Sequence, residues 1–181
     1  VTHILNTTYQ PVQDIKGVVK TGVNEYLLLR DDTVAEFICD TAGVHINSVM
    51  LNIMLRCKTA ERLILISDSF MTPGLDEGTK LIMPDGREVM LKDGVNYQTL
   101  TNHITGSAMT MDASVKSLLR LSDASLMEAS LMASYNPARL LGVDKRKGSL
   151  EAGKDADIIA VDNNFAIHAT FVEGNLVYTR M

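Results

Sequence analysis

The chain lacks several features that would point to particular classes of protein. It has no excess of basic residues, because its 181 residues carry a formal net charge of −5, and this balance disfavours nucleic acid and anionic membranes as partners. No apolar run is long enough to cross a bilayer, and the first residues do not predict a signal peptide. With 46% hydrophobic and 22% charged residues, the sequence predicts an ordinary soluble globular protein.

Cysteine is scarce as well. Cys39 and Cys57 are the only two, and no Cys/His spacing is that of a metal finger. The first lies on a strand-like segment and the second on a helix-like one, which favours two reduced thiols in a cytoplasmic protein. The sequence also has no internal repeat and no low-complexity tract, and its length is enough for one good core.

Short apolar runs that end in a polar residue occur three times in the first part of the chain. Such runs, bounded by turn residues, are typical of buried parallel strands. They cover residues 2–6, 34–40 and 62–68. Helical spacing of apolar residues predicts a helix over 47–58, capped by Asn47, so that strand, helix and strand form a βαβ unit. A weaker helix is predicted over 15–30, where two glycines interrupt the pattern.

The later part of the chain alternates between turns and regular elements. Glycine-containing turns between residues 72 and 100 predict β-hairpins. Helices are predicted after Asp112, as a cap, and over 126–135, where Ser125 and Glu128 form a capping box.

The C-terminal quarter has a clear local pattern. Asn136 is expected to cap a helix that begins at Pro137, and Gly142 is expected to end it in the left-handed conformation. An apolar strand is predicted over 158–161. Alternation over 165–171 predicts another strand, and a Gly-Asn turn leads from it into a third.

Candidate catalytic groups follow the ends of the predicted strands. In a barrel of parallel strands the active-site residues sit at the C-terminal strand ends, and His3, His45 and Asp68 fit that pattern. A metal-dependent hydrolase needs imidazole or carboxylate ligands, and a carboxylate that takes a proton from water and gives it to the leaving group. A strand-end aspartate among apolar residues suits the second task, because burial raises the pKa of a carboxylate.

Each of these residues also has an ordinary structural interpretation. A lone histidine near a strand end, such as His3, is more often a hydrogen-bonded structural residue. A lone aspartate after an apolar strand, such as Asp68, is often a helix or turn cap. His168 falls on the polar face of an edge-like strand and should face solvent, whereas His103 lies in a loop where either role is open.

Beyond these local patterns, the chain resembles a known family. Residues 136–142 and 147–162 resemble the closing segment of the amidohydrolase superfamily, where the chain leaves a catalytic barrel and returns to a small β-sandwich. Five motifs occur in the order typical of N-acetylglucosamine-6-phosphate deacetylases. They are Thr2–Asn6, Gly43–Ile46, Ile66–Ser69, Thr105–Met111 and the C-terminal segment itself. The resemblance covers the whole chain but only the later part of that family's sequence.

The resemblance implies an α/β fold, namely the C-terminal part of a (β/α)8 TIM-type barrel plus a small β-sandwich domain. The expected divisions are the last barrel strands and helices over 1–72, a β-hairpin excursion over 73–100, a substrate loop with the closing barrel helices over 101–145, and the sandwich over 146–181. It also implies metal-dependent hydrolysis of the N-acetyl group of N-acetylglucosamine 6-phosphate by a homodimer, with zinc or a similar divalent metal ion as cofactor.

Individual roles carry over from the family by matching position. His3 matches a metal-site histidine, and Asp68 matches the catalytic aspartate. The positions matched to substrate binding are Asn6, Thr7, His45 and the loop residues Ile104, Thr105 and Gly106.

Three departures from the family pattern leave alternatives open. The stretch 9–14 lacks the arginine that usually binds phosphate, and Lys16 and Lys20, the nearest cations, lack its bidentate fork. Two residues separate Asp40 from Gly43, where the family has Asp-Gly. The family's earlier metal ligands, a glutamate and another histidine, are absent. The alternatives are an amidohydrolase that acts on a non-phosphorylated amide and a non-catalytic fragment.

Overall fold

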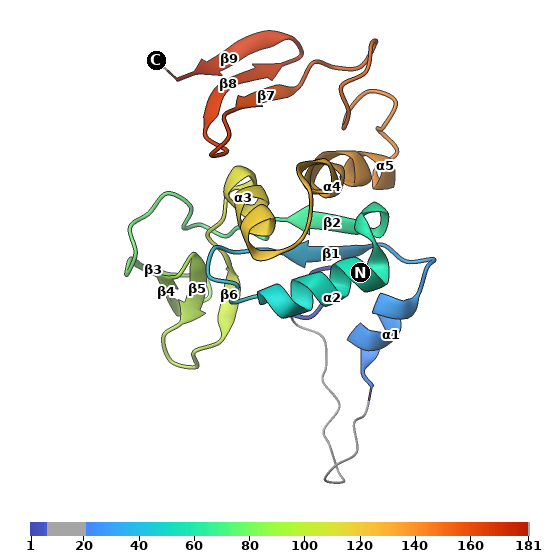
Figure 1. Ribbon diagram of the computed structural model, residues 1–181. Coiled ribbons are helices and arrows are strands. Elements are labelled where there is room, and N and C mark those ends of the chain that lie inside the picture. The colour runs from blue at the N-terminus through green and yellow to red at the C-terminus, as the bar shows by residue number, and fades with distance from the viewer. Residues whose placement is uncertain (7–20, 181) are drawn as a thin grey trace.

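The computed structural model describes residues 1–6 and 21–180, which form a mixed α/β fold (Figure 1). Two parallel strands, β1 (Ala35–Ile38) and β2 (Leu63–Ile66), pair from end to end, and α2 (Ser48–Lys58) connects them. Both strands are almost wholly apolar and are buried, as expected of parallel strands that are covered on both faces. The predicted βαβ unit is confirmed.

Helices lie on both sides of this strand pair (Figure 1). On one side α1 (Val23–Leu29) packs against α2, and a 3-10 helix (Ala60–Arg62) leads from α2 into β2. Of the weaker helix predicted over 15–30, residues 15–20 lie outside the described part. The other side is covered by α3 (Met111–Leu121), α4 (Leu126–Ser130), the π-helical segment η2 (Leu131–Tyr135) and α5 (Asn136–Leu140).

The helix-capping predictions are confirmed at two helices and wrong at a third. Asn47 accepts a hydrogen bond from the Met50 amide at 3.0 Å at the start of α2. Ser125 and Glu128 form the predicted capping box of α4. The helix α3, by contrast, begins after Thr110, and Asp112 lies within its first turn.

Asn136 is not a helix cap, which corrects another prediction. The segments α4, η2 and α5 follow one another without a break, so Asn136 continues a helix and begins none. Its side-chain amide donates instead to the carbonyl oxygens of Ala60 and Leu63, both at 2.7 Å. The residue therefore joins α5 to the start of β2, a contact that no local pattern reveals. Gly142 does adopt the predicted left-handed conformation, with φ at 70°.

Residues 1–6 form a turn and not the predicted strand. Positive φ angles at His3 (29°) and Leu5 (75°) interrupt the extended conformation. The segment nevertheless lies along β1, because Glu36 donates to the Val1 carbonyl and accepts from the Ile4 amide, both at 2.8 Å.

Two antiparallel sheets follow the parallel pair (Figure 1). The first contains, in order, β3 (Lys80–Ile82), β4 (Glu88–Lys92), β5 (Val95–Gln98) and β6 (Ile104–Ser107). A bridge between Ser69 and Ser107 connects β6 to the segment that follows β2. The second contains β7 (Ile158–Val161), β8 (Ile167–Val172) and β9 (Asn175–Thr179). The predicted hairpins and C-terminal strands are confirmed.

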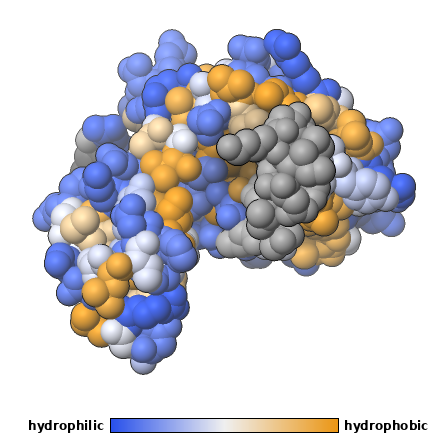
Figure 2. All heavy atoms as spheres, turned by 90° about the horizontal axis from the view of Figure 1, so that it is seen from below, coloured by the Kyte–Doolittle hydropathy of each residue, from blue (hydrophilic) through white to orange (hydrophobic). Residues whose placement is uncertain are grey.

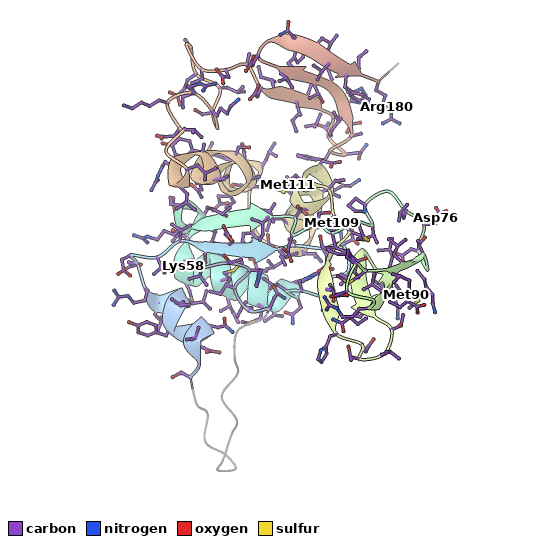
Figure 3. All side chains as sticks on the ribbon, turned by 180° about the vertical axis from the view of Figure 1, so that it is seen from behind. Lys58, Asp76, Met90, Met109, Met111 and Arg180 are labelled. Carbon is purple, nitrogen blue, oxygen red and sulfur yellow. The ribbon has the colours of Figure 1, made fainter. Side chains whose placement is uncertain are left out.

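Lys58, at the end of α2, is buried although it is charged (Figure 3). Its ammonium group donates to the Thr33 carbonyl at 2.7 Å, to the Thr33 hydroxyl at 2.6 Å and to the Arg30 carbonyl. These acceptors satisfy all three of its donors, which explains how the charge is tolerated in the interior. Lys58 therefore connects α2 to the segment that precedes β1.

The described surface is partly apolar. Large side chains such as Leu29, Leu100 and Met127 are exposed, and Figure 2 shows apolar patches on the face seen from below. Within residues 1–6 and 21–180, no helix has the length and hydrophobicity needed to cross a membrane.

Candidate active site

A cavity of about 80 Å³ opens at the carboxyl end of the parallel strands. Because β1 and β2 run in the same direction, the segments that follow them meet at one edge of the sheet. The turn of residues 1–6 and the strand β6 complete the walls. The lining residues are His3, Asn6, Ile38, His45, Asp68, Ile104 and Gly106.

The cavity thus brings together six of the eight residues named from the sequence. Thr105 does not line it, because alternate residues of β6 face opposite sides, and its hydroxyl accepts a hydrogen bond from Gln98 at 3.0 Å. Thr7 lies outside the described residues, as do residues 9–14 and the lysines at 16 and 20. Ile38 was missed, although its place as the last residue of β1 could have indicated it.

Asp68 lies two residues beyond β2 in a left-handed conformation, with φ at 45°. Its carbonyl accepts a hydrogen bond from the Ser107 amide at 2.9 Å. Gly106 approaches closely from β6, so that a β-carbon there would lie 3.0 Å from the Asp68 carbonyl oxygen. Asp68 is exposed, however, and the expectation of a buried aspartate is wrong for the described chain. The turn carries it out of the strand layer to the rim of the cavity.

His45 is buried and is held by Asp40, which follows β1. The His45 Nδ1 atom lies 3.0 Å from one carboxylate oxygen of Asp40, and the His45 amide donates to that oxygen at 2.8 Å. The other oxygen accepts from the amides of Ala42 and Val44 at 3.0 and 2.9 Å. Sequence reasoning treated Asp40 only as a departure from the family spacing and did not predict its contact with His45.

The pKa of Asp40 reflects two opposing effects. Burial alone would raise it, because the charged form loses its hydration. Hydrogen bonds from the His45 side chain and from the His45 and Val44 amides outweigh burial and lower the pKa below its ordinary value of 3.8. Asp40 is therefore an ionised acceptor at neutral pH.

Asn6 is oriented by the neighbouring loop. Its side-chain amide nitrogen donates to the His45 carbonyl at 3.0 Å. The Asn6 Oδ1 atom is buried and has no hydrogen-bond partner among the described residues. A buried acceptor without a partner is unfavourable, and Asn6 is among the residues that line the cavity.

The described residues supply only part of a metal site. His3 and His45 provide imidazoles and Asp68 a carboxylate, which are suitable ligand types for zinc. Within residues 1–6 and 21–180, however, no group of three or more histidine, cysteine, aspartate or glutamate side chains is close enough to hold a metal ion. The donors described here therefore do not form a complete metal site.

The two other histidines lie away from the cavity. His168 is exposed on β8, as predicted, and its Nε2 atom lies 3.4 Å from Asp162. His103 is exposed in the turn before β6.

Residues 40–177 match the model of the amidohydrolase family, and the chain belongs to that family. The N-acetylglucosamine-6-phosphate deacetylase of Vibrio furnissii is 35% identical over 168 residues, which are 90% of this chain and 38% of that protein. The N-acetylgalactosamine-6-phosphate deacetylase of Escherichia coli O157:H7 is 33% identical over 141 residues, which are 78% of this chain and 36% of that protein.

A solved structure of a deacetylase is also similar to the chain. The crystal structure of N-acetylglucosamine-6-phosphate deacetylase from Pasteurella multocida matches with a TM-score of 0.84 at 27% identity, and the match covers 99% of this chain and 44% of that one. The chain thus spans about two fifths of the length of these relatives.

Proposed function

We propose that the protein of which this chain forms a part hydrolyses the N-acetyl group of N-acetylglucosamine 6-phosphate and gives glucosamine 6-phosphate and acetate. The observation that carries the proposal is the cavity. Three separate segments bring His3, His45 and Asp68 to its walls, in a chain that is about one third identical to deacetylases of this kind.

The carboxylate of Asp68 moves the proton in this reaction. It takes a proton from the attacking water as the new C–O bond forms at the acetyl carbonyl. When the C–N bond of the resulting tetrahedral intermediate breaks, it gives that proton to the leaving amine. His45 binds the sugar and orients it in the cavity. The exposure of Asp68 at the rim makes it accessible to water.

His3 is the proposed contribution of this chain to a divalent metal site, with zinc or a similar ion as the metal. When bound, such an ion supplies Lewis acidity at the acetyl carbonyl. Because the described donors are incomplete, further ligands must come from outside residues 1–6 and 21–180.

The finer architecture is also a proposal. We assign residues 1–72 and 101–145 to a TIM-type barrel, residues 73–100 to a hairpin excursion, and residues 146–181 to a β-sandwich, because deacetylase structures match the chain over nearly its whole length. Exposed apolar side chains support a homodimer. A cytoplasmic location is consistent with the thiol of Cys39, whose pKa burial raises to about 12 and which is therefore unreactive.

N-acetylgalactosamine 6-phosphate is a second candidate substrate, because one relative is a deacetylase of that sugar phosphate. The relatives do not favour the alternative of a non-phosphorylated amide, since their names specify a 6-phosphate.

The test is a deacetylation assay of the intact protein with both sugar phosphates and with unphosphorylated N-acetylglucosamine. Asp68→Asn should lower kcat by about 10²- to 10⁴-fold, because a positioned general acid–base contributes that much. Asp93→Asn is the matched control, since Asp93 is also an aspartate with positive φ (55°) but lies in the turn between β4 and β5. An intact protein that turns over neither sugar phosphate would refute the proposed function.

A further inference from the structure

The contact between Asp40 and His45 has no part in the proton transfer proposed above, although it borders the cavity. The side chains of Asp40 and His45 are 0% and 2% exposed, and His45 is among the residues that line the cavity. A buried carboxylate that contacts an imidazole fixes both the orientation and the protonation pattern of the ring.

The hydrogen bonds around Asp40 determine which nitrogen of His45 carries its proton. Both carboxylate oxygens of Asp40 accept hydrogen bonds from backbone amides, which can only donate. The ionised carboxylate itself has no proton and can only accept. The Nδ1 atom, 3.0 Å away, must therefore be the donor. In the neutral ring the Nε2 atom is then an acceptor.

We propose that Asp40 is a positioning residue that holds neutral His45 in the Nδ1–H tautomer, so that Nε2 accepts a hydrogen bond from a hydroxyl of the substrate. The inference rests on the proposed function, in which the ligand is an amino sugar rich in hydroxyl donors. Asn6 lines the same cavity, and its buried Oδ1 atom has no hydrogen-bond partner among the described residues.

A merely structural role is the competing explanation, because an aspartate that binds backbone amides also stabilises a turn. Asp162 is the natural comparison. Its Oδ1 atom accepts from the amides of Asn164 and Ala166, two and four residues later, and its other oxygen lies 3.4 Å from a histidine. That pair is exposed.

Asp40→Asn tests the proposal in the intact protein. The new side chain has one oxygen and one NH₂ group. If the oxygen still accepts from the amides of Ala42 and Val44, the NH₂ group faces His45 and can only donate. The Nδ1 atom must then accept, so the ring moves to the Nε2–H tautomer and Nε2 no longer accepts from a hydroxyl.

Asp162→Asn is the control. Both variants are examined by NMR with ¹⁵N-labelled histidine at a pH where the rings are neutral, and His45→Gln assigns the signal.

The wild type should show Nδ1–H at His45, and Asp40→Asn should shift it toward Nε2–H. The same variant should lower kcat/KM by about 10- to 100-fold, as expected for the loss of a substrate hydrogen bond. Asp162→Asn should change neither. A wild-type His45 with its proton on Nε2 would overturn the proposal even if Asp40→Asn failed to fold. A folded variant whose tautomer shifts to Nε2–H while kcat/KM stays at the wild-type value would overturn it as well. Lack of deacetylase activity in the wild type would instead refute the proposed function and leave the tautomer result standing.

Discussion

Two aspartate turns in this chain have the same backbone pattern but different surroundings. Asp40 and Asp162 each accept from the amides two and four residues later, and each contacts a histidine. The first pair is almost completely buried beside the cavity, whereas the side chains of the second are 39% and 52% exposed. The local motif is thus a way to build a turn. Burial and a neighbouring cavity are what make the first pair a candidate for function.

The two pairs should also differ in energy. Two exposed charges are well hydrated whether or not they pair, so an exposed ion pair contributes little to the free energy of unfolding. Removal of one partner from a buried pair leaves the other without hydration and without a hydrogen bond, which is strongly unfavourable. Each of the following predictions changes one side of this comparison and uses the other as the reference.

The largest expected effect is that of Asp40→Ala. The substitution leaves three backbone amides and the His45 ring without their acceptor. We expect the free energy of unfolding to fall by about 3–5 kcal/mol. Asp162→Ala should cause a clearly smaller loss, because water replaces the carboxylate there. Chemical denaturation of both variants measures the difference, and equal losses would show that burial of the first pair has no energetic consequence.

A smaller effect is expected from acid. The pKa values of Asp40 and Asp162 are both lowered in the folded protein, the second mainly by the hydrogen bond from the Ala166 amide. Their contribution to stability is therefore present above the ordinary value of 3.8 and is lost as pH falls through the lower folded value. The gap in unfolding free energy between wild type and Asp40→Asn should be constant near neutral pH and should narrow below about pH 4.

Denaturation curves recorded between pH 7 and pH 3 provide the measurement. Asp162→Asn should show the same direction with a smaller gap, because its charge is screened by solvent. A gap for Asp40→Asn that widens toward low pH would contradict the lowered pKa and the hydrogen bonds that explain it.

Much of the fold could be predicted from the sequence because its signals are local. The apolar runs that became β1 and β2, the Asn47 cap and the capping box at Ser125 depend on residues close in the chain. The failures involve contacts between distant residues. Asn136 has the appearance of a cap, but its amide binds carbonyls more than seventy residues earlier. The turn at His3 depends on hydrogen bonds to β1 that no local pattern contains.

The candidate site shows the same limit. Family position was enough to name six residues that the fold brings to one cavity. It did not reveal the partner of His45, because Asp40 lies five residues earlier in the chain and only the folded loop places its carboxylate against the ring. The apolar run before Asp68, a local pattern, led us to expect that this aspartate is buried. The left-handed turn at that residue is a matter of backbone geometry and carries the side chain outward.

The smallest expected difference concerns two glycines, one in each region. Gly106 and Gly174 both have positive φ angles, 66° and 79°, so alanine at either should cost about 1–2 kcal/mol of backbone strain. At Gly106 the added β-carbon would also lie 3.0 Å from the Asp68 carbonyl, whereas at Gly174 the nearest atom is 3.9 Å away. Gly106→Ala should therefore destabilise the protein more and, by displacing Asp68, lower kcat, while Gly174→Ala changes only the melting temperature. If both variants had the same melting temperature and kcat were unchanged, the close approach of β6 would not hold Asp68 in place. The backbone at the rim of the cavity would then accommodate a β-carbon as readily as the exposed turn between β8 and β9.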